Sequence, residues 1–192
     1  MKKALFWIMI LPISFCFSNE QEIADAIQYV SKKSGIDARI YYSIIDVESN
    51  FKPYTIGMVV NSSILKAIKD LPSAIYNVKV SRYNGKYHFI SVFSDKEEDI
   101  VALAKSLYKF DFNIDMGLMQ ISRQHVREDE LEFIFNPKYN LIKGNNIFAE
   151  CVKKYKVLSQ SIECYNKGFK EKSILQYYRK FVNSFNKHFG KK

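Results

Sequence analysis

The hydrophobic pattern at the start of the chain predicts a pair of helices. Apolar residues recur there at the three- and four-residue spacing of one helix face: Ile23, Ala26, Ile27 and Val30. This spacing predicts a first helix over 21–30. A second helix is predicted over 37–48, because Gly35 interrupts the pattern and Asp37 stands where an N-cap residue is expected.

The pattern changes after Pro53. A short helix is predicted over 64–71, and beyond it apolar and polar residues alternate as they do along a strand. Asn84 and Gly85 then mark a tight turn, because both residue types accept the positive φ that a two-residue hairpin loop requires. The sequence therefore predicts an antiparallel hairpin over about 75–93.

The rest of the chain is predicted to be helical. Asp95 is expected to cap a helix whose first turn is acidic, and apolar residues repeat at helical spacing over 140–152 and again over 174–189. Only four Pro and seven Gly interrupt the chain. These features predict an α+β fold that is mainly α, with the hairpin inside an insertion at about 58–110.

Composition and charge narrow the class of protein. With 192 residues, 47% of them hydrophobic, the chain is expected to form one domain around one core. A net charge of +9 fits a polyanionic or anionic partner. Nucleic acid is not expected, because no helix-turn-helix, zinc or aromatic RNA-binding pattern accompanies the charge. Residues 171–192 are basic and aromatic, which predicts a helix that packs on or extends the domain, or one that touches an anionic envelope surface.

The first residues predict an export signal. Lys2 and Lys3 precede an apolar run over 4–17 that is short for a membrane span, and a small residue follows it. We expect residues 1–18 to be a signal peptide and the protein to be periplasmic. Cys16 leaves open a lipoprotein signal as the alternative.

Export changes the interpretation of the cysteines. Cys151 and Cys164 would remain after processing, and an oxidising compartment favours a disulfide between them over two buried free thiols. No metal site is expected, because His88, His125 and His188 are scattered and neither cysteine has a second ligand at zinc spacing.

One carboxyl group is placed for acid chemistry. Glu48 ends the second predicted helix beside an apolar stripe formed by Ile40, Ile44 and Val47. Desolvation on such a stripe disfavours the charged form and raises the pKa of the carboxyl group. Glu48 is therefore a candidate to donate a proton to a glycosidic oxygen.

Four short motifs, in order, support this interpretation: Glu48-Ser49, Gly117-Leu118-Met119-Gln120-Ile121, Asn140-Leu141 and Tyr165-Asn166-Lys167-Gly168. Over most of 22–170 the chain resembles the lysozyme-like domain of soluble lytic transglycosylases, which implies such a domain over 19–170. The segments 48–57 and 112–117, with the hairpin, look like the specialised branch that accompanies type IV secretion, conjugation, pilus and type III secretion systems.

The resemblance implies a substrate and a set of roles. Glu48 would protonate the bond between N-acetylmuramic acid and N-acetylglucosamine in peptidoglycan glycan strands, then accept the C6 hydroxyl proton as an anhydro ring closes; no cofactor is implied. Secretion or pilus components are possible partners. Substrate-binding roles carry over to Ser49, Gly117, Met119, Gln120, Tyr165 and Asn166. Gln120 would bind polar groups of the sugar, Gly117 would allow close backbone approach, and Tyr165 would contact Glu48 or the sugar.

Two alternatives remain open. Asp115 could be the second carboxylate of a hydrolytic muramidase, although the resemblance favours a loop-fixing role for it. Asp46 is a poor candidate for that task because it projects from another side of the helix than Glu48. The chain could also be a non-catalytic peptidoglycan-binding scaffold, against which the presence of Glu48 on its apolar stripe argues.

Overall fold

The structure, a computed structural model, describes residues 19–169 and 175–190. The predicted signal peptide at 1–18, with its lipidation alternative at Cys16, lies outside the described residues. Within them, no helix combines the length and apolar character needed to cross a bilayer.

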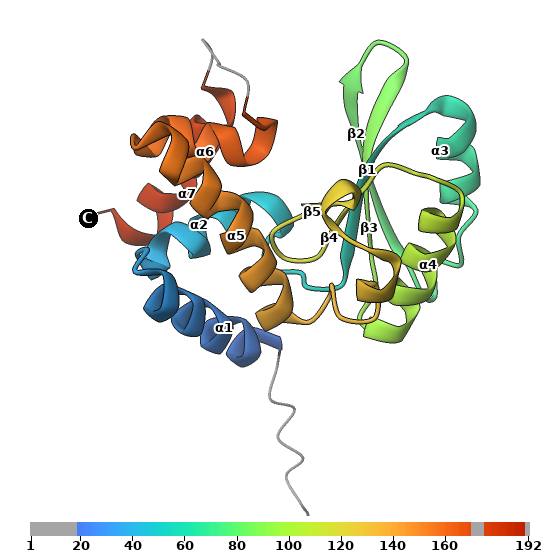
Figure 1. Ribbon diagram of the computed structural model, residues 1–192. Coiled ribbons are helices and arrows are strands. Elements are labelled where there is room, and N and C mark those ends of the chain that lie inside the picture. The colour runs from blue at the N-terminus through green and yellow to red at the C-terminus, as the bar shows by residue number, and fades with distance from the viewer. Residues whose placement is uncertain (1–18, 170–174, 191–192) are drawn as a thin grey trace, which may run out of the picture.

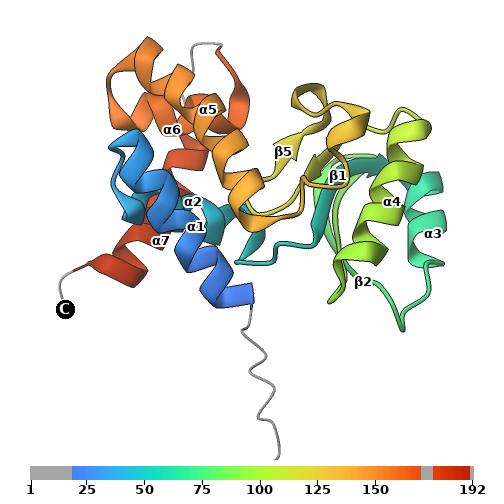
Figure 2. The ribbon, with the colours of Figure 1, turned by 60° about the horizontal axis from the view of Figure 1, so that its bottom comes forward.

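Helices form one side of the molecule, and a sheet with two further helices forms the other (Figure 1). The helical side holds α1, α2, α5, α6 and α7, and its elements pack as the pairs α1 with α2 and α5, α5 with α6, and α7 with α2 and α6. Figure 2 shows the same division after rotation. These helices are α1 (Asn19–Ser34), α2 (Ala38–Ser49), α5 (Pro137–Tyr155), α6 (Leu158–Lys167) and α7 (Gln176–Phe189).

The sheet is antiparallel and has the strand order β2-β3-β1-β4-β5. Two helices, α3 and α4, pack against it. The elements are β1 (Thr55–Asn61), α3 (Ser62–Lys69), β2 (Asn77–Asn84), β3 (Tyr87–Phe93), α4 (Glu97–Lys109), β4 (Ile114–Met116) and β5 (Ile121–Ser122). Two 3-10 turns, η1 (Arg123–His125) and η2 (Glu128–Glu130), lead from the sheet toward α5.

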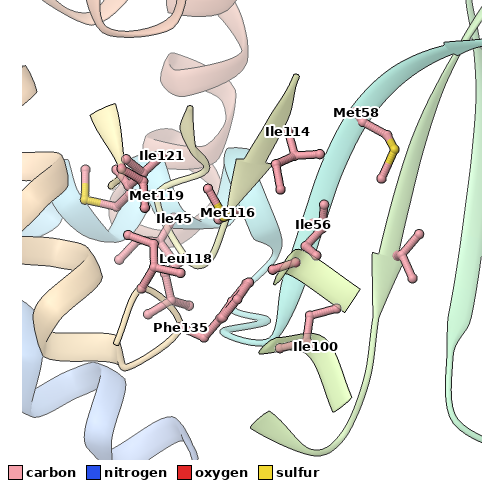
Figure 3. Close-up of a cluster of buried hydrophobic side chains, with 14 of the residues drawn as sticks. Ile45, Ile56, Met58, Ile100, Ile114, Met116, Leu118, Met119, Ile121 and Phe135 are labelled. Atoms are coloured by element: carbon pink, nitrogen blue, oxygen red, sulfur yellow. The ribbon is translucent and has the colours of Figure 1, made fainter. Parts of the chain in front are cut away.

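One continuous core joins the two sides (Figure 3). Ile45 from α2, Ile56 from β1 and Phe135 before α5 are all fully buried within it. Leu118 and Met119, in the loop between β4 and β5, are fully buried as well. Since burial of apolar surface drives folding, the loop is fixed from both sides by the same packing that makes the domain.

The predicted fold class is confirmed: seven α-helices and a small antiparallel sheet are found among the described residues. The predicted hairpin is present as β2 and β3, with Gly85 at positive φ in its loop. However, the hairpin is the outer part of a larger sheet. The sequence pattern missed β1, β4 and β5.

The starts of α4 and α5 differ from the predictions for reasons that lie in their capping. The N-cap of α4 is Lys96 rather than Asp95, and no side chain caps it directly. Instead Ser94 Oγ accepts a hydrogen bond from the Lys96 amide at 3.2 Å and donates one to Asp99 at 3.2 Å. Helix α5 begins earlier than 140, because Asn136 caps it and Pro137 occupies its first turn.

The C-terminal helix α7 is held on α2 through Asp46. The Asp46 carboxylate accepts a hydrogen bond from the Ser184 hydroxyl at 2.7 Å and lies 3.2 Å from His188 Nε2. Ser184 is buried, so its hydroxyl cannot bond to water and depends on Asp46 as its hydrogen-bond acceptor. Asp46 thus faces α7 and contributes to helix packing.

We expect Asp46→Ala to lower the free energy of unfolding by about 1–3 kcal/mol, because it leaves the buried Ser184 hydroxyl without an acceptor. Urea unfolding would measure the change. The matched control is Asp70→Ala, since Asp70 is exposed and makes no side-chain hydrogen bond or ion pair among the described residues. Equal unfolding free energies for the two variants would contradict the role of Asp46.

Candidate active site

A cavity of about 470 Å³ lies between the helical side and the sheet. Its wall takes Glu48 from α2, Asp115 from β4, Gln120 from the loop after β4, and Tyr165 and Asn166 from the last turn of α6. Residues far apart in the sequence therefore converge on one space. Its volume lies in the range of ordinary ligand sites.

Glu48 lies deep in the molecule but keeps part of its surface open to this cavity. Burial raises the pKa of its carboxyl group from 4.5 to about 7. A hydrogen bond from Tyr177 opposes that shift, and the nearby Asp115 adds to it. At neutral pH a substantial fraction of Glu48 is therefore protonated and able to donate a proton.

Asp115 is the second carboxyl group on the cavity wall. Burial raises its pKa to about 6, and a hydrogen bond with the Ser122 side chain opposes the shift. Ser122 lies on β5 directly opposite Asp115 in the strand pairing. Asp115 is thus held in place by a residue of the neighbouring strand. Its negative charge disfavours a second negative charge on Glu48 and so raises the Glu48 pKa.

Tyr177, a residue that the sequence patterns did not single out, binds the acid. Its hydroxyl donates a 2.6 Å hydrogen bond to Glu48 Oε1 across 129 residues of sequence. The pKa of Tyr177 is raised well above 10, first by burial and then by the charge of Glu48, so the phenol stays a donor. The sequence identified α7 as an aromatic helix but not as part of the site.

A buried carboxylate holds the start of α7. Leu175, the N-cap residue, offers no side-chain cap. Glu163 on α6 instead accepts a 2.9 Å hydrogen bond from the Tyr178 amide, and its other oxygen is paired with Lys167. This contact satisfies a free amide of the first helical turn next to Tyr177. Glu163 therefore positions Tyr177.

The loop that carries Gln120 is held by Asn140, which is fully buried. The Asn140 amide donates to the carbonyl oxygens of Met116 at 3.0 Å and Ile134 at 2.8 Å. Its Oδ1 accepts a 2.8 Å hydrogen bond from the Met119 amide. One side chain thereby ties α5 to both ends of the 116–119 segment.

Three of the predicted substrate-binding residues line the cavity: Gln120, Tyr165 and Asn166. Gln120 has a positive φ of 45°, and its side-chain amide donates a 2.8 Å hydrogen bond to the Gly117 carbonyl oxygen. The Tyr165 hydroxyl donates to the Met119 carbonyl oxygen at 2.6 Å. The contact with Glu48 that the sequence assigned to Tyr165 as one option is therefore made by Tyr177.

The other three predicted substrate-binding residues lie in different surroundings. The Ser49 hydroxyl donates to the Ile45 carbonyl oxygen of its own helix at 3.2 Å. Met119 is fully buried and fills the space beside Gly144 of α5. At Gly117, with φ +76°, an added Cβ would overlap the Asn140 amide, so this glycine allows close approach of a side chain of the protein itself. None of the three lines the cavity.

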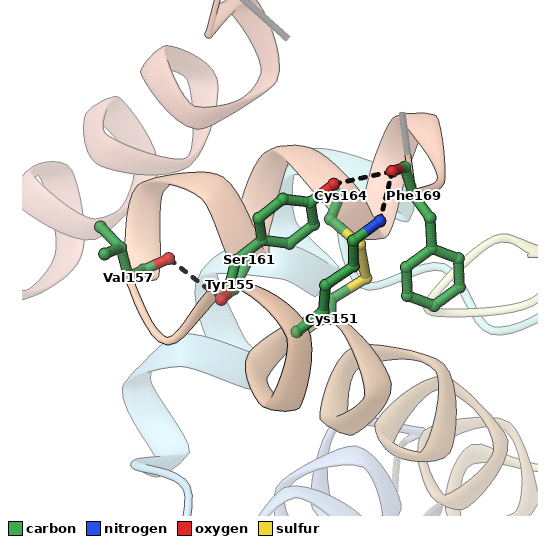
Figure 4. Close-up of a disulfide and its surroundings, with 7 residues drawn as sticks. Cys151, Tyr155, Val157, Ser161, Cys164 and Phe169 are labelled. Carbon is green, nitrogen blue, oxygen red and sulfur yellow. Dashed lines mark hydrogen bonds between the residues drawn. A yellow bond between two sulfur atoms is a disulfide. The ribbon is translucent and has the colours of Figure 1, made fainter. Parts of the chain in front are cut away.

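The structure joins Cys151 of α5 to Cys164 of α6 in a disulfide, with a Cα–Cα distance of 5.8 Å (Figure 4). Both cysteines also border the cavity. Since Cys164 directly precedes Tyr165 and Asn166, the bridge fixes the end of α6 that carries these two residues. Among the residues that the structure describes, no cluster of potential metal ligands is present.

The comparison with family models decides the family. The model of the transglycosylase SLT domain matches residues 25–184, which is most of the chain. The protein belongs to the transglycosylase SLT family. Searches of curated proteins and of solved structures give no significant match.

Membership fixes the general activity. The SLT protein is a peptidoglycan lytic transglycosylase, an enzyme that cleaves glycosidic bonds of peptidoglycan, and this substrate implies a place of action outside the cytoplasm. The match begins in α1 and runs into α7 as far as Ser184, so it includes the helix that supplies Tyr177.

In this SLT protein we expect Gly117→Ala to lower the unfolding free energy by about 1–3 kcal/mol beyond the penalty of positive φ, because the new Cβ overlaps Asn140. Gly35→Ala is the matched control: Gly35 has nearly the same φ, +74°, but nothing lies within 4 Å of its Cβ position. Its expected loss is about 1–2 kcal/mol, from backbone conformation alone. Chemical denaturation would compare them, and equal losses would contradict the packing role of Gly117.

Proposed function

We propose that the protein cleaves the β-1,4 bond between N-acetylmuramic acid and N-acetylglucosamine and leaves a 1,6-anhydromuramic end, with Glu48 as the catalytic residue. The observation that carries this proposal is the carboxyl group of Glu48, which lies on the wall of a cavity and has a pKa raised by burial to about 7. Such a group donates and accepts protons at neutral pH.

The reaction needs two proton transfers through one residue. Glu48 donates its proton to the glycosidic oxygen as the bond to C1 of the muramic acid breaks. The carboxylate then takes the proton of the C6 hydroxyl while the C6 oxygen bonds to C1, so that no water is consumed. An internal nucleophile gains from proximity, and the acid is regenerated as the ring closes.

Supporting roles follow from contacts. Tyr177 stabilises the Glu48 carboxylate that exists between the two transfers, since its hydrogen bond favours the charged form. Gln120, Tyr165 and Asn166 line the cavity and would contact the glycan. Ser49, Gly117 and Met119 support the acid and the loop without touching the substrate.

A hydrolytic muramidase is the second candidate, because Asp115 shares the cavity with Glu48. In that reaction Asp115 would hold a water or stabilise the sugar cation. Its raised pKa, about 6, leaves it mostly charged at neutral pH. We favour the anhydro product, with Asp115 tuning Glu48 by repulsion and stabilising positive charge on the sugar.

The resemblance to the specialised branch supports a cellular role. We propose that residues 1–18 direct export to the periplasm, and that the enzyme opens the wall locally for a secretion, conjugation or pilus machine. The proposed division into a catalytic domain at 19–170 and a C-terminal helix at 171–192 fits a helix that completes the site through Tyr177.

Mass spectrometry of muropeptides released from purified peptidoglycan tests the reaction. We expect anhydromuropeptides from the wild type and a loss of at least about 100-fold with Glu48→Gln, which keeps the shape but removes the acid. Glu150→Gln is the matched control, because Glu150 is an exposed glutamate of α5 that does not line the cavity.

Asp115→Asn separates the two candidates. A lytic transglycosylase retains anhydro ends with this variant at a reduced rate. Reducing muramic ends from the wild type, lost with Asp115→Asn, would establish the muramidase instead. Binding to peptidoglycan without any product from the folded wild type would contradict both.

The pH dependence tests the Tyr177 contact. Glu48 donates only while protonated, so kcat/KM is expected to fall as pH rises through about 7. Tyr177→Phe removes a hydrogen bond that lowers the Glu48 pKa. In this variant the falling limb of the profile of kcat/KM against pH should therefore move to higher pH.

Tyr165→Phe serves as the control for that shift. The Tyr165 hydroxyl bonds to the Met119 carbonyl oxygen and not to Glu48, so the limb should keep its position. A limb that stays in place with Tyr177→Phe, or moves equally with both variants, would refute the role of Tyr177.

A further inference from the structure

The cavity extends beyond the acid to an aromatic side chain that the mechanism does not use. Phe169, just past the end of α6, lines the same cavity as Glu48 and is 51% exposed. We propose that Phe169 is a stacking platform for a sugar ring of the glycan strand, which makes it a substrate-binding residue distant from the cleaved bond. This inference rests on the proposed function.

The position of Phe169 is fixed by its backbone. Its carbonyl oxygen accepts hydrogen bonds from Lys154 Nζ at 2.7 Å and from the Tyr155 hydroxyl at 2.8 Å, both at the end of α5 (Figure 4). The disulfide between α5 and α6 lies beside these contacts (Figure 4). An exposed ring on a fixed backbone loses little conformational freedom when a ligand covers it.

Gly168 sets the direction in which the chain leaves α6. It has φ +75°, and its amide donates a 2.7 Å hydrogen bond to the Cys164 carbonyl oxygen. Helix α6 therefore ends at once, and the next residue borders the cavity instead of continuing along the helix axis. The turn is what brings an apolar ring to the rim of a polar site.

The charges on the wall favour an uncharged ligand at this end. Among the lining side chains of the described residues, Lys167 is the one lysine or arginine, and it is paired with the buried Glu163. That positive charge is already neutralised. Lys154 does not line the cavity; its Nζ is bound to the Phe169 carbonyl oxygen and lies 5.2 Å from the centroid of the Phe169 ring. A carboxylate or phosphate therefore has little to gain on the cavity wall. Gln124 also lines the cavity and offers an uncharged amide for hydrogen bonds.

A pyranose ring matches this combination. A β-linked sugar with equatorial substituents presents axial C–H groups on its faces and hydroxyl or acetamido groups around its edge. The face of a phenyl ring is negative and attracts C–H groups, while neighbouring amides bind the edge. A platform of this kind binds a sugar without regard to the peptide that it carries.

Calorimetric binding of β-1,4-linked N-acetylglucosamine oligomers, from dimer to hexamer, tests the proposal. In the Glu48→Gln background, Phe169→Ala should weaken binding of the longest oligomers about tenfold, the loss of one aromatic contact, and leave the dimer unaffected. Phe169→Trp should restore binding. With the active enzyme on peptidoglycan, Phe169→Ala should raise KM by a similar factor, with kcat little changed.

Phe110→Ala is the matched control, since Phe110 is 70% exposed at the end of α4 and does not line the cavity. The platform is refuted if Phe169→Ala binds every oligomer as the parent does, if Phe110→Ala shows the same loss, or if no oligomer binds at all. Length-dependent binding without any muropeptide release by the wild type would overturn the reaction and retain the platform. Release of anhydromuropeptides that is insensitive to Phe169→Ala would support the proposed reaction and overturn the platform.

Discussion

The site depends on the three hydrogen bonds of one buried neutral side chain. Asn140 satisfies the carbonyl oxygens of Met116 and Ile134 and the amide of Met119, all of which belong to fully buried residues. Without it, three buried backbone groups would each lose a hydrogen bond. The loop between β4 and β5 is therefore held to α5, and this loop carries Gln120 to the cavity wall and gives Tyr165 its acceptor. Gly117 lacks a side chain so that Asn140 can reach these groups.

Around this frame, burial and hydrogen bonding act on Glu48 in opposite directions. Burial, the larger effect, favours the neutral acid, and the Tyr177 hydroxyl favours the carboxylate. The balance leaves the Glu48 pKa near 7, so that at neutral pH the group is neither always charged nor always neutral. A residue that must give and then take a proton benefits from this balance, because neither state is strongly disfavoured.

Local patterns predicted the parts of the fold that local physics determines. Amphipathic spacing predicted α1 and α2, and Asp37 caps α2 as expected, with its Oδ1 accepting from the Arg39 amide at 2.8 Å. The position of Glu48 on an apolar stripe predicted a raised pKa for the same reason. By contrast, β1 is buried on both faces over 55–58 and contains Gly57, so its sequence shows no alternation of apolar and polar residues there. Strands β4 and β5, of three and two residues, are too short for any period.

The missed site residues are those whose role depends on distant partners. Tyr177 was one tyrosine in an aromatic helix, and nothing within α7 distinguishes it from Tyr178. Asn140 belonged to a motif, but its partners lie in three separate segments. At α4 the sequence predicted Asp95 as the N-cap, whereas the N-cap is Lys96 and its amide is bound by Ser94. In each case the choice is made by tertiary contacts that spacing alone does not encode.

The hydrogen bond between Tyr177 and Glu48 joins an early helix to the last one, across 129 residues. During synthesis the acid, the sheet and most of the cavity emerge before α7 exists. A nascent or truncated chain that lacks α7 thus carries the acid without its hydrogen-bond donor and leaves one side of α2 uncovered. Full tuning of the acid therefore requires α7 to be in place on α2.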